Sequence, residues 1–408
     1  MGSPGRQEWQ RFWYLPVAAA VGYSTAVLHT YGLGPFIAPL EAEFGWTRSS
    51  ISAGISIAGI IGALFSIPLG MAVDRFGPRI VAFIGVTVMT AGFASLGMVG
   101  GQLWQWYLTW IVIGIGNLFV QATVWTSAIT TRFSASRGMA IAVTLSGGAI
   151  TATFLPIIAT WLIDSYGWRG GFGAIGAIWA VVVLPTLFFF FRGGRDFRGG
   201  RDDPRGKAEG AQATGSDAAG VLAVPGFYQL LLASGIFTLT GIGIVVHFVP
   251  ILQDFGADPL AAAGVAALIG VFSIIGRLGT GVLLDRFRPN LVGAFVFLMP
   301  LIACLLLLSA GGSAVAQTAA AACFGLALGA EVDVIAFLVS RCFGLRRYGA
   351  IFGAMVGAMA LGSAAGPLAA GAIHDAFASY APFLLASAAF LAAGALALGL
   401  LKVPPVEP

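Results

Sequence analysis

The sequence GMAVDRFGPR at residues 70–79 recurs as GVLLDRF at residues 281–287, displaced by 211 positions. The same displacement brings Pro156 onto Pro367, in a different segment of each half. One constant offset across separate segments indicates a duplicated unit, which is typical of proteins built from two structural repeats. We therefore divide the chain into two related halves and interpret each copy of the motif as a loop between two apolar segments.

The sequence around both copies is strongly apolar. Of its 408 residues, 58% are hydrophobic and 9% are charged, whereas soluble domains carry roughly 25% charged residues. This deficit excludes a cytosolic enzyme, a disordered protein and a nucleic-acid-binding protein, and it predicts that the chain lies in a lipid bilayer.

Twelve stretches are long enough to cross a membrane, because a spanning helix needs about 20 mostly apolar residues. They cover residues 13–36, 50–73, 80–100, 103–130, 138–163, 171–191, 226–252, 260–284, 291–310, 314–339, 349–373 and 382–401. Pro35 and Pro39 are expected to end the first of them. The predicted fold is an all-α membrane protein with twelve transmembrane helices in two six-helix pseudo-repeats.

A polar segment separates the two halves. Residues 192–207 are rich in glycine, arginine and aspartate and follow no helical period, which is typical of a solvated linker. The predicted organisation is an N-terminal six-helix half over 1–191, a cytoplasmic linker over 192–224 and a C-terminal six-helix half over 225–408. The alternative is that the linker is a regulatory or lipid-touching segment.

The distribution of basic residues predicts the orientation. With both termini in the cytoplasm, every Lys and Arg lies on the cytoplasmic side except Arg48, Arg169 and Arg277. This asymmetry is the one expected of a multi-pass protein in a cytoplasmic (inner) membrane. The net charge of +4 therefore reflects orientation and not an affinity for acidic partners.

The sequence contains no motif typical of a metal site or a cofactor site. The three cysteines, Cys304, Cys323 and Cys342, lie in or at the end of apolar runs and lack the spacing of metal ligands. No nucleotide-binding loop is present, so ATP coupling is not expected. We predict no cofactor, no metal and no enzymatic activity.

Ionisable residues inside the membrane are costly and are functional candidates by default. Arg277 has the strongest claim, because a guanidinium stays protonated there and offers a planar fork of donors to a carboxylate. The repeat places Ser66 at the corresponding position, so the charge belongs to one half only. The alternative is a structural ion pair between Arg277 and Glu331 or Asp333.

Four groups are candidates for proton coupling. Glu331 and Asp333 are two positions apart on one helix, which places them about 200° apart, so both cannot face one cavity. We expect Glu331 on the cavity side and Asp333 in helix packing. His247 and His29 are further candidates, although His247 could instead face water at a helix end and His29 could be satisfied by a local hydrogen bond.

The motif at 70–79 resembles the signature loop of the major facilitator superfamily, and the copy at 281–287 lies where that superfamily repeats it. The residues that carry the resemblance, and that we assign to gating, are Gly70, Asp74, Arg75, Gly77, Arg79, Asp285 and Arg286. An aspartate at a helix end beside arginines can clamp neighbouring helices in one state and release them in another. The alternative is that these arginines only fix the orientation.

Several further stretches resemble the monocarboxylate porter and oxalate/formate antiporter branch of this superfamily. They begin at Glu43, Arg132, Tyr166, His247 and Gly329. The resemblance implies that Arg277 binds the carboxylate of the substrate. It also implies that Leu28, Asn117, Leu145 and His247 contribute to substrate binding.

Two departures narrow the substrate class. Animal members of the branch have an acidic residue four positions before the arginine, where this chain has Ser273, so another group must carry any coupled proton. Oxalate carriers use a second cation on helix 11, which here contains no Lys or Arg. One fixed cation suits one carboxylate, because a dianion would leave an uncompensated charge in a dry site.

These observations predict a secondary active transporter of small, lactate-like monocarboxylates, coupled to protons by symport and alternating access. Its partners are then a monocarboxylate anion and a proton, and it functions as a monomer. The transport alternative is an organic-anion exchanger of the oxalate/formate type. The alternative of another class is a membrane sensor that binds the anion without moving it.

Overall fold

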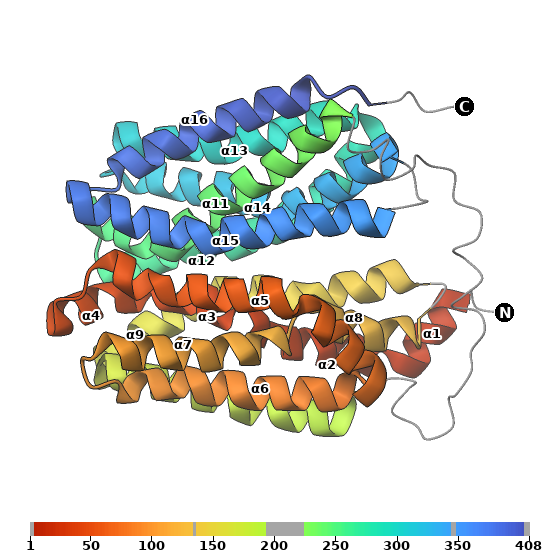
Figure 1. Cartoon of the computed structure of the whole chain (residues 1–408), viewed down its shortest axis with the longest axis horizontal. Coiled ribbons are helices and arrows are strands. Elements are labelled where there is room, and N and C mark those ends of the chain that lie inside the picture. Colours follow the sequence, from red (N-terminus) through yellow and green to blue (C-terminus); the bar gives the residue numbers. More distant parts are fainter. Residues whose placement is uncertain (1–3, 134–135, 193–223, 344–347, 404–408) are drawn as a thin grey trace. The chain divides into compact units, whose positions relative to one another are not determined.

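A computed structural model describes residues 4–133, 136–192, 224–343 and 348–403, and these contain helices and no strands. The chain forms two compact units, Met1–Asp202 and Asp203–Pro408 (Figure 1). The division falls within the predicted linker at 192–224, most of which lies outside the described residues.

The N-terminal half consists of helices that differ widely in length. They are α1 (Pro4–Phe12), α2 (Tyr14–Tyr23), η1 (Ser24–Val27), α3 (Leu28–Leu33), η2 (Gly34–Phe36), α4 (Ile37–Phe44), α5 (Arg48–Phe76), α6 (Pro78–Ser95), η3 (Leu96–Met98), α7 (Leu103–Leu118), α8 (Ala122–Thr130) and α9 (Arg137–Phe190). The hydroxyl of Thr47 caps α5 by accepting from the backbone of Ser50 at 3.2 Å. Gly77 then separates α5 from α6 with a φ of 82°, a conformation that favours glycine.

The first predicted span is divided into short helices. A 3-10 turn, η1, separates α2 from α3, and a second one, η2, precedes α4. The expectation that Pro35 and Pro39 end this span is wrong, because each proline lies in the first turn of a short helix, where a missing N–H is tolerated. The helical segment ends instead at Gly45, whose φ is 64°.

The fourth predicted span is also interrupted, between α7 and α8. The indole of Trp125 donates to the carbonyl of Val120 at 2.7 Å and so satisfies one acceptor that the break exposes. Gly22 packs against the ring of Trp125, and His29 lies edge-on to Trp110 with ring centroids 6.2 Å apart. The helices on either side of the two interruptions therefore contact each other in pairs, α2 with α8 and α3 with α7.

The fifth and sixth predicted spans are joined as α9. They meet at Gly167, whose φ of 70° and ψ of 167° are not helical, so the chain turns there. Gly167 has open space around it, and its role is conformational. The predicted break between these two spans therefore corresponds to a kink inside one helical segment.

The C-terminal half contains longer, continuous helices. They are α11 (Pro225–Asp254), α12 (Pro259–Arg286), α13 (Pro289–Ala310), α14 (Ala314–Phe343), α15 (Tyr348–Phe377) and α16 (Ala381–Gly399). Figure 1 shows α11 beside α15, and the two make extensive contact. The apolar faces of the six helices form one core with large buried aromatic side chains such as Phe248 of α11, Phe297 of α13 and Phe324 of α14.

Within this half, α12 and α14 approach each other unusually closely. A Cβ atom at Gly329 would overlap the backbone carbonyl of Ser273, and one at Gly276 would overlap that of Leu326. Small residues permit such close contact between membrane helices. The contact fixes which faces of α12 and α14 oppose each other.

Ten helical segments of the described residues are long and apolar enough to cross a membrane. One of them runs through the kink at Gly167 and covers two predicted spans, and the divided first span is not among the ten. The helices are therefore consistent with twelve crossings, and the all-α fold class is confirmed.

Candidate functional site

Arg277 and Asp333 form an ion pair on the facing sides of α12 and α14. Arg277 Nε lies 3.8 Å from Asp333 Oδ2, which is too long for a hydrogen bond. The two side chains are 36% and 42% exposed. Arg277 makes no hydrogen bond to any residue that the structure describes, so its guanidinium donors remain available to a ligand.

The close contact of α12 with α14 explains why these two side chains meet. Ser273 and Arg277 are one helical turn apart on α12, and Gly329 and Asp333 are one turn apart on α14. Because Gly329 packs on Ser273, the next turn of each helix brings Asp333 to Arg277. The backbone contact thus fixes the position of the charge pair.

Glu331 lies on the buried side of α14. Its side chain is buried, with 4% exposure, and its Oε1 atom has no hydrogen-bond partner among the described residues. Asp333, which is partly exposed, is therefore the carboxylate that pairs with Arg277, and the expectation that Glu331 faces the cavity stays a prediction. A carboxylate buried without a cation is strongly disfavoured, so we expect Glu331 to hold a proton in this arrangement.

His247 is fully buried and both of its ring nitrogens have protein partners. Nε2 lies 3.0 Å from the carbonyl oxygen of Pro367, and Nδ1 lies 2.6 Å from the hydroxyl of Tyr380. A carbonyl can only accept, so Nε2 carries the hydrogen and the Tyr380 hydroxyl donates to Nδ1. His247 therefore joins α11 to α15 and to the residue before α16, and the alternative that it faces water is wrong.

A second histidine at the same end of the C-terminal half forms an ion pair that the sequence did not suggest. His374 Nε2 lies 3.2 Å from Asp254 Oδ2, and the His374 ring packs on Tyr380 with centroids 4.6 Å apart. Asp254 ends α11 and His374 lies near the end of α15. The two residues are far apart in the sequence, so no local signal identifies the pair.

The candidate residues in the N-terminal half differ in their exposure. His29 is buried, and its Nδ1 has no hydrogen-bond partner among the described residues. Leu28 has no exposed surface in this half, whereas Asn117 and Leu145 are partly exposed. Asn117 lies in the last turn of α7, next to the interruption of the fourth span.

The signature loop is described in part. The side chains of Asp74 and Asp285, together with Gly70, lie outside the residues whose side chains the structure describes. Arg75 and Arg286 are exposed at the ends of α5 and α12.

Arg79 is held more firmly than the other basic residues of this loop. Its Nη2 donates to the carbonyl of Phe188 at 2.6 Å, and its guanidinium lies over the Phe188 ring, 5.7 Å from the centroid. This pair joins the start of α6 to the end of α9.

A second cluster of charges lies beside the turn at Gly167. The indole of Trp168 donates to Glu43 Oε2 at 2.5 Å, and Arg169 pairs with Glu43 Oε1. These contacts, first Trp168 and then Arg169, lower the pKa of Glu43 below its ordinary value. Both sequence segments were singled out by the family resemblance, but their contact was not predicted.

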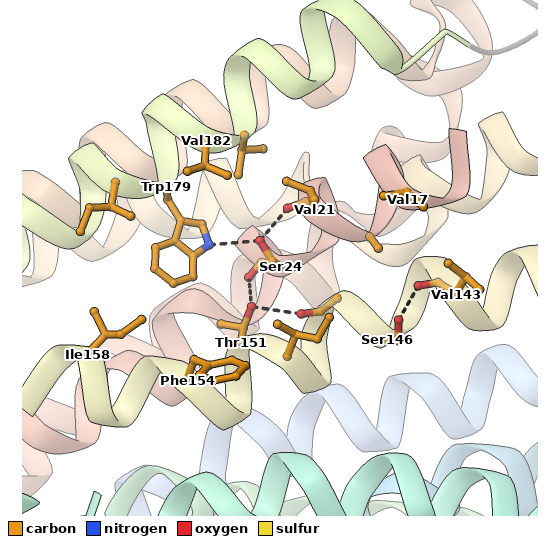
Figure 2. Close-up of a pocket in the computed structure, with 15 residues that line it drawn as sticks. Val17, Val21, Ser24, Val143, Ser146, Thr151, Phe154, Ile158, Trp179 and Val182 are labelled. Atoms are coloured by element: carbon orange, nitrogen blue, oxygen red, sulfur yellow. Dashed lines mark hydrogen bonds between the residues drawn. The ribbon is translucent and has the colours of Figure 1, made fainter. Parts of the chain in front are cut away.

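A cavity of about 460 Å³ lies within the N-terminal half, between α2, η1 and α9 (Figure 2). The few polar atoms of its wall are already engaged: Trp179 Nε1 donates to Ser24 Oγ at 3.1 Å, and Thr151 Oγ1 donates to the Ser24 carbonyl at 3.2 Å. Ser146 Oγ donates to the Val143 carbonyl at 2.6 Å, and the rest of the lining is glycine, aliphatic or aromatic. The cavity therefore suits hydrocarbon and offers no partner for a carboxylate.

Metal ligands are not gathered anywhere in the described residues, where no group of three or more His, Cys, Asp or Glu side chains could hold an ion. The charged groups that the structure brings together between α12 and α14 are the Arg277 guanidinium and the Asp333 carboxylate.

Comparison with known proteins identifies the relatives of this chain. A model of the Major Facilitator Superfamily matches residues 19–366. The chain is 26% identical over 380 residues to monocarboxylate transporter 13 of Rattus norvegicus, covering 90% of this chain and 83% of that protein. It is 26% identical over 372 residues to the gallate transporter of Pseudomonas putida, covering 80% of each. It is 29% identical over 282 residues to the uncharacterized MFS-type transporter YcxA of Bacillus subtilis, covering 67% of this chain and 65% of that protein.

Solved structures share the fold. A mutant of the nucleoside transporter NupG gives a TM-score of 0.72 at 13% identity, covering 94% of this chain and 98% of that one. A bacterial homolog of the human lysosomal transporter Spinster, inward-facing and unoccupied, gives a TM-score of 0.67 at 17% identity, covering 98% and 94%. At these identities the likeness concerns the fold alone.

Proposed function

This chain belongs to the Major Facilitator Superfamily and is a transporter rather than an enzyme, and we propose that it carries a small monocarboxylate together with a proton. The observation that carries the proposal is the loose ion pair of Arg277 with Asp333. It combines a permanent cation that has unused donors with a carboxyl group that can take up a proton.

Arg277 is the proposed ligand of the substrate carboxylate. A guanidinium binds a carboxylate through two parallel N–H···O bonds, which are stronger than the single 3.8 Å contact with Asp333. The incoming anion can therefore displace Asp333. Both side chains are more than a third exposed, so an anion can reach Arg277 without opening the core of the half.

Asp333 is the proposed carrier of the proton. When the substrate occupies Arg277, Asp333 loses its cation, and a carboxylate without a counter-charge in a membrane protein favours protonation. One anion and one proton together leave the net charge of the site unchanged. This neutrality would let the loaded transporter change conformation without moving a net charge through the membrane.

The structure supports the other candidates for proton coupling to different degrees. Glu331 is a second possible proton site, because it is buried without a described partner and lies two residues from Asp333. His247 is disfavoured, since exchanging its proton would break a hydrogen bond to Pro367 or Tyr380. His29 stays a candidate through its unpartnered Nδ1 atom.

The substrate class rests on the single cation and on the relatives. Among the described residues of helices α11 to α16, Arg277 is the only cation placed well inside a span, which suits one carboxylate better than two. A monocarboxylate transporter and a gallate transporter are among the relatives, and gallate is also a single carboxylate. In the N-terminal half, we keep the partly exposed Asn117 and Leu145 as candidate substrate-binding residues and give Leu28, which has no exposed surface, a packing role.

The proposed location is the cytoplasmic membrane, with both termini in the cytoplasm and the monomer as the functional unit. The exposed basic residues at the described helix ends support this orientation, since Arg75, Arg192, Arg286 and Arg288 all lie in loops predicted to be cytoplasmic.

Uptake into proteoliposomes tests the proposal. Labelled lactate, pyruvate, benzoate and oxalate are offered to the purified protein with an inward proton gradient, without a gradient, and with unlabelled anion inside. We expect the gradient to drive accumulation of the monocarboxylates and not of oxalate. Accumulation that ignores the gradient but requires an internal anion would replace symport by exchange, and binding without uptake would indicate a sensor.

A further inference from the structure

A groove in the N-terminal half lies between α6 and the end of α9. It has a volume of about 560 Å³ and is lined by Arg79, Ile80, Phe83, Ile84, Thr87, Val88 and Phe188. Ile80, Ile84 and Phe188 are each about half exposed, so apolar walls are open to the surroundings. In a membrane-spanning helix pair, these walls are suited to a hydrocarbon chain.

One end of the groove carries a fixed cation. Arg79 is held at this end by its hydrogen bond to the Phe188 carbonyl and by its position over the Phe188 ring. That bond uses one of five guanidinium donors, so the others can bind a second acceptor. The Thr87 hydroxyl is not available as a donor to a ligand, because it already donates to the Phe83 carbonyl at 2.8 Å. The groove is therefore charged at one end and apolar along the rest of its length.

The surroundings of Arg79 add positive charge. Arg75 precedes it near the end of α5, with Asp74 beside it in the sequence, and Arg192 follows the end of α9; both arginines are exposed. The N-terminus of α6 begins one residue before Arg79 and has no side-chain cap, so its free N–H groups add to the positive potential. No carboxylate is among the residues that line the groove.

A second groove of similar size has no cation and can be compared with the first. It lies in the C-terminal half between α11 and α16, has a volume of about 470 Å³ and includes Leu232, Ile236 and Ala397. No charged residue lines it. Both grooves therefore have apolar walls, but of the two only the groove at Arg79 also has a cation.

We propose that the groove between α6 and α9 binds one anionic phospholipid, with the phosphate at Arg79 and an acyl chain along Ile80, Ile84 and Val88. Arginine recognises phosphate oxygens through paired donors, and basic pockets between membrane helices bind lipid head groups. The site is separate from Arg277, and it does not depend on which substrate the protein carries.

Native mass spectrometry of the full-length protein in detergent tests this site. Phosphatidylglycerol and phosphatidylcholine with identical acyl chains are titrated in parallel, and inorganic phosphate is added in a third arm. We expect one phosphatidylglycerol to bind more tightly than phosphatidylcholine by about tenfold, because the quaternary ammonium of phosphatidylcholine offsets the phosphate charge that Arg79 attracts. Equal affinity for the two lipids, or displacement of phosphatidylglycerol by equimolar phosphate, would overturn the proposal.

Two variants and a matched control locate the bound lipid. Arg79→Gln should reduce the affinity for phosphatidylglycerol to that for phosphatidylcholine, and Ile84→Trp should weaken both lipids by filling the groove. Arg288→Gln removes the same charge at the start of α13, away from the groove, and should leave the preference unchanged. If Arg79→Gln does not yield folded protein, Ile84→Trp alone decides: unaltered lipid binding by that variant contradicts the site.

Discussion

Replacing Asp333 by asparagine should separate substrate binding from proton coupling. In the proposed cycle Asp333 competes with the substrate for Arg277 and takes up a proton when it loses that competition. Asparagine has nearly the same shape but neither charge nor a titrating proton. Asp333→Asn should therefore bind the substrate more tightly and yet fail to use a proton gradient.

The size of the binding effect follows from the geometry of the pair. At 3.8 Å, two unit charges attract by roughly 4 kcal/mol with an effective dielectric constant of 20, and by roughly 1 kcal/mol in bulk water. Because both side chains are more than a third exposed, the screened figure applies. Removing about 1 kcal/mol of competition should strengthen substrate binding by about fivefold.

Two measurements on the same preparation test this prediction. Equilibrium binding of labelled lactate gives the affinity, and proteoliposomes report both gradient-driven uptake and exchange of internal for external lactate. We expect Asp333→Asn to retain exchange and lose gradient-driven accumulation. Glu331→Gln is the control on the same helix and should not strengthen binding, since Glu331 does not pair with Arg277. Full gradient-driven uptake by Asp333→Asn, or weaker binding, would refute the role given to Asp333.

Three further substitutions test other contacts within the two halves. Gly329→Ala places a methyl group against the Ser273 carbonyl and should lower the free energy of unfolding by about 1–3 kcal/mol, whereas Gly353→Ala enters open space and should not; thermal unfolding in detergent compares them. Tyr380→Phe removes the donor to a buried histidine and should destabilise the protein by about 1–3 kcal/mol in the same assay, and an unchanged melting temperature would contradict the assigned hydrogen bond. Glu43→Gln should lower stability at neutral pH, because contacts that lower the pKa of Glu43 stabilise the fold above the ordinary value of 4.5. That difference should disappear as the pH falls through the lowered pKa, and a difference that grows in acid would show the opposite sign.

The fold could be predicted from the sequence because it depends on features that need no knowledge of packing. The repeated motif at 70–79, the apolar lengths and the scarcity of charge together predicted the helical membrane fold. Arg277 was identified for the same reason, since a lone cation inside an apolar span is conspicuous whatever surrounds it.

The arrangement of the carboxyl groups could not be predicted in the same way. Helical periodicity correctly separated Glu331 from Asp333, but it does not say which face of α14 opposes α12. The contact of Gly329 with Ser273 settles that question, and it joins two helices that are distant in the sequence. Pairs that join distant elements, such as Asp254 with His374, leave no local pattern at all.

The interruptions of the first and fourth spans were missed for a related reason. Their sequences are as apolar as those of continuous helices, and composition alone predicts one unbroken segment. The break in the fourth span is accompanied by a local side-chain hydrogen bond from Trp125 to the Val120 carbonyl, which satisfies an acceptor that lacks its helical partner.

The most direct measurement is equilibrium binding of lactate and of its neutral amide to the wild-type protein and to Arg277→Gln and Arg277→Lys. If Arg277 binds the substrate carboxylate, the wild type should bind lactate and not the amide, Arg277→Gln should lose lactate binding, and Arg277→Lys should bind more weakly because lysine lacks the planar fork. Unchanged lactate binding by Arg277→Gln would contradict the account at its centre.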